Sequence, residues 1–88
     1  MEAKKVFEDE HITLNLVESN PISGESQFTI DEREENVGFY YITVVFESGD
    51  QSRLEYDGGN PRRDKYPVIK SNHLKDAIAD ISAIRVRD

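Results

Sequence analysis

The sequence contains no cysteine and no tryptophan. Without cysteine the chain can form no disulfide, which small secreted domains commonly need for stability, so a reducing compartment is favoured. The first ten residues, MEAKKVFEDE, lack the apolar core of a secretory signal. The longest apolar run, residues 37–46, is too short to cross a bilayer as a helix. We therefore expect a cytoplasmic protein without a membrane partner.

Residue patterns typical of catalysis are also missing. Neither the G-x-S-x-G motif of serine hydrolases nor the phosphate loop G-x-x-x-x-G-K-[ST] occurs. The two histidines, His11 and His73, are expected to be surface or boundary side chains. On a strand, the acidic run 8–11 brings at most two ligands to one face, fewer than a zinc or calcium site needs. We predict a non-enzymatic protein with no cofactor and no metal.

Basic residues are scarce, and they are unevenly distributed. The chain has 18 acidic and 11 basic side chains and a net charge of −7. Residues 1–60 carry a net charge of −10, whereas residues 61–88 carry +3. An acidic body repels nucleic acids and anionic membranes, while the basic C-terminal third can contact an anion locally.

The length of 88 residues suits one domain, spanning residues 1–88. A core of this size leaves a stability margin of only about 3–5 kcal/mol. Association with a second copy is one way to widen that margin, so a homodimer is one expected state.

Apolar residues alternate with polar ones through most of the chain. Residues 11–17, 27–31 and 51–57 each read as a half-buried antiparallel strand. The segment Phe39–Ser48 is apolar on both faces, which predicts a central strand covered on both sides. The turn at residues 48–51 should join it to the next strand as a hairpin.

One segment near the C-terminus has helical spacing instead. Ser71 or Asn72 can cap a helix, and an apolar stripe follows at i, i+3, i+4 and i+7: Leu74, Ala77, Ile78 and Ile81. Alternation returns at residues 83–87, and residues 3–8 are a weaker strand candidate. We predict an α+β fold: an antiparallel sheet of five or six strands with one C-terminal helix packed on one face.

A single helix can cover only one face of the central strand. The opposite face carries Phe39, Tyr41 and Val45, which then need a curled sheet, a long loop or a second molecule as cover. Left open, such an apolar face is a candidate contact surface for a partner.

The segment 61–67, PRRDKYP, places three cations and an aromatic residue between prolines on a predicted loop. Arg62 and Arg63 can form forked hydrogen bonds with phosphates or carboxylates. Lys65 adds charge, and Tyr66 can stack on a base. The alternative is that these cations neutralise the protein's own acidic body.

Two functions are compatible with these features. The first is a protein-binding module or inhibitor, in a sharper form an acidic nucleic-acid mimic that occupies the basic groove of a nucleic-acid-handling enzyme, as small acidic phage proteins do as a class. The second is a single-stranded nucleic-acid-binding protein that uses the basic segment 61–70. Beside the aromatic face and the basic loop, the candidate contacts are the carboxylates Glu32, Glu34, Glu35, Glu47 and Asp50.

Overall fold

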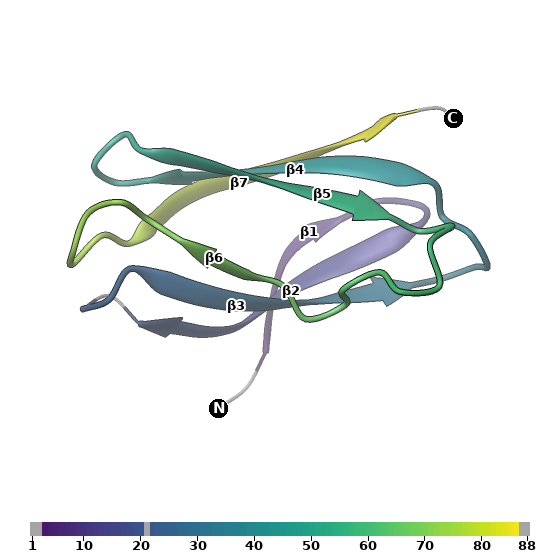
Figure 1. Cartoon of the computed structure of the whole chain (residues 1–88), viewed down its shortest axis with the longest axis horizontal. Coiled ribbons are helices and arrows are strands. Elements are labelled where there is room, and N and C mark those ends of the chain that lie inside the picture. Colours follow the sequence, from purple (N-terminus) through teal and green to yellow (C-terminus); the bar gives the residue numbers. More distant parts are fainter. Residues whose placement is uncertain (1–2, 21, 87–88) are drawn as a thin grey trace.

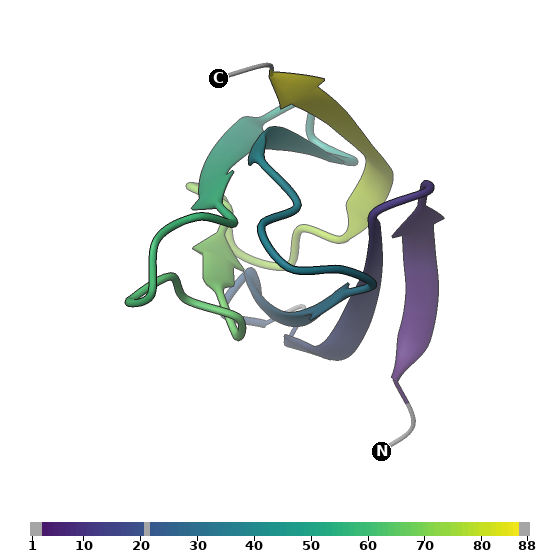
Figure 2. The same ribbon diagram turned by 90° about the vertical axis from the view of Figure 1, so that its right-hand side faces the viewer.

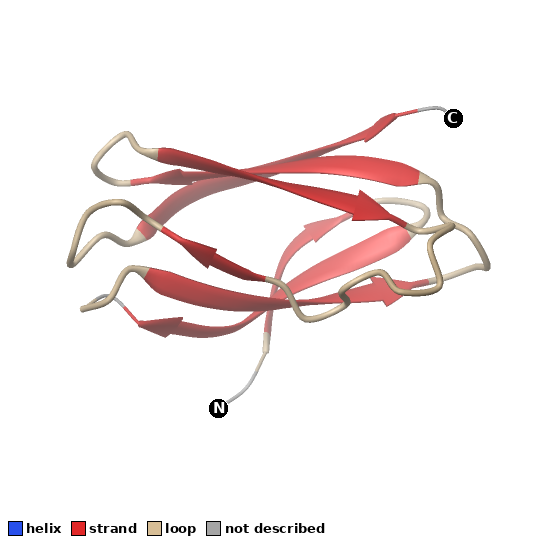
Figure 3. Cartoon of the chain, viewed as in Figure 1, coloured by secondary structure: helices blue, strands red, loops and turns tan. Residues whose placement is uncertain are grey.

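The computed structural model describes residues 3–20 and 22–86, and all of its regular structure is β. Seven antiparallel strands follow one another along the chain (Figure 1). Their bounds are β1 Lys4–Glu8, β2 Ile12–Asn20, β3 Glu25–Glu32, β4 Phe39–Phe46, β5 Gln51–Asp57, β6 Val68–Lys70 and β7 Ile78–Val86. Figure 3 shows strands and loops only in the described part of the chain.

The strands form two sheets that face each other. The first sheet has the order β1-β2-β3-β6 and the second the order β5-β4-β7. The molecule measures 37 × 26 × 22 Å. Viewed along its length, the two sheets curve around a common interior (Figure 2). Each sheet therefore supplies the cover for one face of the other.

The core lies between the sheets and follows the alternation of the strands. On β4, Tyr40, Ile42, Val44 and Phe46 are buried, whereas the residues between them are only half-buried. The opposite sheet contributes the remaining apolar layer, chiefly Ile12, Leu14, Phe28, Ile30 and Ile69. Alternation at period 2 is what lets one sheet bury one face.

The predicted α+β fold with a C-terminal helix is wrong, because the described residues contain no helix. Residues 71–77 form a loop, and Leu74, the first residue of the predicted apolar stripe, is 76% exposed. Lys75 has a φ of 57°, which is incompatible with a right-handed helix. Strand β7 then begins at Ile78. The chain has no helix long and apolar enough to cross a membrane among these residues.

The helix prediction fails because of contacts between segments that are distant in the sequence. Strand β4 is central, as predicted, and needs a neighbour on each side to satisfy its backbone groups. β5 supplies one side, and β7 supplies the other with a register from Phe39↔Val86 to Phe46↔Ile78. Pairing along the whole of β4 outweighs the weak helical preference of residues 74–81.

Polar residues near the start of the predicted helix form hydrogen bonds that connect two loops. Asp76 is 6% exposed and accepts hydrogen bonds from the Ser48 backbone N–H at 3.0 Å and from the Ser48 and Ser71 hydroxyls, each at 2.6 Å. Burial alone would raise the pKa of Asp76, but these hydrogen bonds outweigh it and hold the pKa below its ordinary value. Asp76 thereby fastens the β4–β5 turn to the loop that precedes β7.

The other strand predictions fare better. The segments predicted at 11–17, 27–31 and 51–57 lie in β2, β3 and β5, and the hairpin at 48–51 joins β4 to β5. The weaker candidate at 3–8 is β1. The short strand β6 was not predicted, and Arg87, placed in the last predicted strand, lies outside the described residues.

Candidate functional site

Two loops meet at one end of the molecule, which we call the loop end: residues 33–38 and 58–67. The Gly58 N–H donates to the Gly38 carbonyl at 2.8 Å and holds the loops together. An open groove of about 520 Å³ lies between them. Its lining brings together most of the charged residues predicted to bind a partner: Glu32, Glu34, Glu35, Arg63 and Lys65.

The centre of the groove is an ion pair between Glu32 and Arg63. Arg63 Nε donates to Glu32 Oε2 at 2.6 Å, and Arg63 Nη2 donates to Glu32 Oε1 at 2.8 Å. The buried Tyr56 hydroxyl also donates to Glu32, and Lys65 Nζ lies 3.9 Å from it. Only 8% of the Glu32 side chain is exposed. Arg63 and Lys65 thus neutralise an acidic group of the protein itself.

The electrostatics of this pair follow from its geometry. The hydrogen bond from Arg63 lowers the pKa of Glu32 and outweighs the opposing effect of burial. The same hydrogen bond raises the pKa of Arg63. For Tyr56, burial is the main cause of a raised pKa, and its bond to Glu32 adds to it. All three groups therefore keep one protonation state at neutral pH.

Replacing Glu32 by glutamine is expected to lower the free energy of unfolding at pH 7 by about 1 kcal/mol, because charge-assisted hydrogen bonds near the surface are lost. Since the pKa of Glu32 lies below its ordinary value of 4.5 in the fold, its stabilisation is complete above that value and is lost as pH falls through the folded-state pKa. Urea unfolding from about pH 7 to about pH 3 tests this. The difference in free energy of unfolding between the variant and the wild type should shrink as the pH falls. Glu35→Gln, at an exposed neighbour, is the control, and a gap constant across the series would contradict the assignment.

An aromatic row borders the loop end on the outer face of the second sheet. Phe39 and Tyr41 are half-buried, and their rings meet edge to face at 5.2 Å. The Arg53 guanidinium lies over the Tyr41 ring, 4.2 Å from its centre. These residues lie on the face of β4 that was expected to need a cover other than the helix. The first sheet packs against the opposite, inner face of β4, so this outer face stays half-buried within the described chain.

A second groove joins the aromatic row to the basic segment 61–67. It encloses about 310 Å³ and is lined by Phe39, Glu55, Asp57, Arg62 and Arg63, among others. Arg63 lines both grooves, so the two form one continuous surface. Arg62 is exposed on the rim, and Tyr66, further along the same loop, is 64% exposed.

Not every predicted contact lies at the loop end. Glu47 and Asp50 belong to the β4–β5 turn at the opposite end of the 37 Å long molecule (Figure 1). The Asp50 carboxylate accepts a hydrogen bond from the Asn72 N–H at 2.8 Å, and this bond lowers its pKa. The acidic set predicted from the sequence is therefore divided between two distant places.

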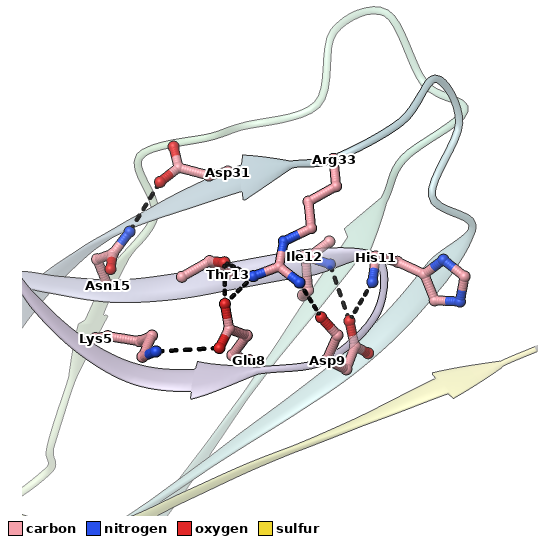
Figure 4. Close-up of polar contacts among 9 residues, drawn as sticks. All are labelled: Lys5, Glu8, Asp9, His11, Ile12, Thr13, Asn15, Asp31 and Arg33. Atoms are coloured by element: carbon pink, nitrogen blue, oxygen red, sulfur yellow. Dashed lines mark hydrogen bonds and ion pairs between the residues drawn. The ribbon is translucent and has the colours of Figure 1, made fainter.

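Sequence reasoning missed a polar cluster beside the loop end, where the β1–β2 turn meets Arg33 (Figure 4). Asp9 accepts hydrogen bonds from the His11 and Ile12 N–H groups at 2.8 and 2.9 Å and from the Tyr40 hydroxyl at 2.6 Å. Arg33 donates to the Asp9 carbonyl at 2.7 Å and pairs with Glu8. A buried tyrosine needs a hydrogen-bond partner for its hydroxyl. The placement of Tyr40 on an inner strand was therefore the one sequence feature that could have indicated this cluster.

This cluster supports the turn between β1 and β2. Burial would raise the pKa of Asp9, but the hydrogen bonds from Tyr40 and the two backbone groups outweigh it, so the pKa lies below its ordinary value. Glu34, another predicted contact, lies 2.5 Å from His11 Nδ1 through its Oε1. Among the described residues, no three His, Cys, Asp or Glu side chains are placed to hold a metal ion.

Comparison with known proteins adds no constraint to this picture. No protein family, curated protein or solved structure matches the chain. Any inference about its function therefore rests on the residues and their geometry.

Proposed function

We propose that this chain is a non-catalytic protein-binding module or inhibitor that docks through the loop end. The observation that supports it is convergence: residues of three separate segments, 32–36, Phe39 and 61–65, line two adjoining grooves. Half-buried aromatic side chains flanked by charged ones are the composition that protein interfaces favour. We also propose a cytoplasmic location, which rests on the absence of cysteine from the sequence.

The chemistry of the partner follows from the free charges. Arg63 and Lys65 lie against Glu32, Arg33 against Glu8 and Glu34 against His11. The other charged side chains around the grooves are mainly acidic: Glu35, Glu55, Asp57 and Asp64, beside the cation Arg62. A partner with basic residues beside an apolar patch fits this surface. A nucleic-acid-handling enzyme is one such partner, and mimicry of its nucleic acid is the sharper form of the proposal.

Direct binding of single-stranded nucleic acid is the weaker candidate. It needs the basic segment 61–70 free for phosphates. Arg63 is engaged by two hydrogen bonds to Glu32, which leaves Arg62, Tyr66 and Lys70 as the exposed contacts of this segment. We therefore rank this function below protein binding.

Replacing Phe39 and Tyr41 together by threonine is expected to abolish capture of the partner from an extract of the native host. Threonine has a high β propensity, so it suits a sheet position. It removes the aromatic anchors, and the loss of each such anchor typically costs more than about 2 kcal/mol of binding free energy. Pull-down with tagged full-length chain, followed by identification of bound proteins, measures the loss. Circular dichroism must show that the variant stays folded.

The matched control changes the other end of the molecule. Glu47→Gln should capture the same partner as the wild type, because Glu47 lies in the distant β4–β5 turn. If the variant with both aromatic residues replaced captured as much partner as the wild type, docking at the loop end would be rejected. For the mimic, excess duplex DNA must compete with the chain for that partner; binding unaffected by DNA would reject mimicry and leave the docking proposal standing.

A further inference from the structure

The C-terminal half of β7 is a sheet edge with no strand beside it in the described chain. β7 pairs with β4 on one side only and ends its sheet. β1 approaches the other side near residues 78–81, where the two strands line a common groove. Residues 82–86 lie beyond that groove, at the rim of the molecule in both views (Figures 1 and 2).

Other edges of the two sheets are protected in the usual ways. β1 carries three charged residues and a register shift, β5 carries Arg53 and Glu55, and β6 is three residues long and preceded by Pro67. Charges, bulges, shortness and proline all discourage pairing with another chain. The segment 82–86, SAIRV, has one charge, and its Ile84 is 68% exposed. It is the least protected edge of the described residues.

We propose that residues 82–86 pair antiparallel with the same residues of a second copy, across a two-fold axis at Ile84. In such a dimer the axis is perpendicular to the sheet, so opposed residues lie on the same face. Ile84 is the midpoint of the free segment, so this register uses all five of its residues. It would join two three-stranded sheets into one of six strands.

The chemistry of the segment fits a second copy. Ile84 opposes its own counterpart, Ser82 opposes Val86, and Ala83 opposes Arg85, so no like charges face each other directly. The segment contains no acidic residue, whereas the net charge of residues 1–60 is −10. The edge therefore lets two acidic molecules approach where their repulsion is weakest. The exposed Ile84 side chains would cover each other.

Because the chain has no cysteine, single thiols can test the register. Ile84→Cys places the two thiols on opposed residues, whose Cβ atoms are about 5 Å apart in a strand pair, close to disulfide geometry. Ser82→Cys, on the same face and edge, places them about 14 Å apart. Under mild oxidation of the full chain, Ile84→Cys should form covalent dimer at least about ten times faster, since pairing raises the effective thiol concentration.

Leu74→Cys, at a 76% exposed apolar position in a loop, gives the rate of random collision. The proposal is overturned if Ile84→Cys is no faster than Leu74→Cys or Ser82→Cys. Light scattering on the wild type is the second measurement. A strand pair of this length buries little area, which is typical of weak complexes, so we expect dimer at about 1 mM and monomer at about 10 µM. A monomer at both concentrations would also overturn it, without affecting docking at the loop end.

Discussion

Replacing Ile42 by alanine is expected to lower the free energy of unfolding by about 2–5 kcal/mol. Ile42 is 1% exposed in the middle of β4, between Leu54 on β5 and Ala83 on β7. Removal of three carbon atoms there leaves a cavity that the two packed sheets can fill only in part. A loss of this size equals most of the stability expected for a domain of 88 residues, about 3–5 kcal/mol. Urea unfolding followed by tyrosine fluorescence or circular dichroism measures it.

Thr43→Ala is the matched control for this prediction. Thr43 is the next residue on the same strand, but it faces outward and is half-buried. We expect this change to cost less than about 1 kcal/mol, as for other positions away from the core. If the two variants lost similar stability, the assignment of the inner and outer faces of β4 would be wrong.

Replacing Gly58 by alanine is the second change with a large expected effect, a loss of about 2–3 kcal/mol. A Cβ atom at this position would lie 2.7 Å from Val37 Cγ2, 2.8 Å from the Gly38 carbonyl oxygen and 3.0 Å from the Val37 N atom. Two of these atoms are backbone, so the loops must separate to admit the methyl group. That movement stretches the hydrogen bond from Gly58 to Gly38 and widens the loop end.

Gly59→Ala separates this steric effect from the general cost of losing a glycine. The nearest atoms to a Cβ at Gly59 are the amide O and N atoms of the Asn36 side chain, at 3.3 and 3.5 Å, and the Asp57 Oδ1 atom at 3.5 Å. All three belong to side chains, which can move. We expect thermal unfolding of this variant close to that of the wild type. In Gly58→Ala, the amide NMR chemical shifts should change mainly for residues 33–38 and 58–67. Equal effects of the two substitutions would contradict close packing of the loops at Gly58.

The Gly58 variant also connects stability with function. The groove depends on the separation of the two loops, because residues of both loops line it. A variant that stays folded at low temperature but has displaced loops should bind the captured partner less well than Gly59→Ala does. Docking that is indifferent to the loops would place the contact on the aromatic row alone.

Much of the candidate site was accessible from the sequence as separate segments. The aromatic pair at residues 39 and 41 stood out because alternation assigned it to the face opposite Tyr40 and Ile42. The cations of residues 61–67 stood out because they interrupt an acidic chain. What the sequence could not provide was the pairing of Arg63 with Glu32, because these residues are 31 positions apart. The contact depends on how β3 and the β5–β6 loop meet in space.

The sequence by itself determined β2, β3, β4 and β5, since a period of two is a local property that a strand expresses wherever its one face is buried. It also determined the excess of acidic charge and the absence of disulfides. Residues 83–86 also lie in a strand, as their alternation predicted. Tertiary structure alone decided residues 71–82. Their local spacing suits a helix as well as a strand, and only the need of β4 for a second hydrogen-bonded neighbour selects the strand. That choice also left the edge of β7 and the outer aromatic row open, because a strand paired with β4 covers neither its own far edge nor the outer face of the sheet.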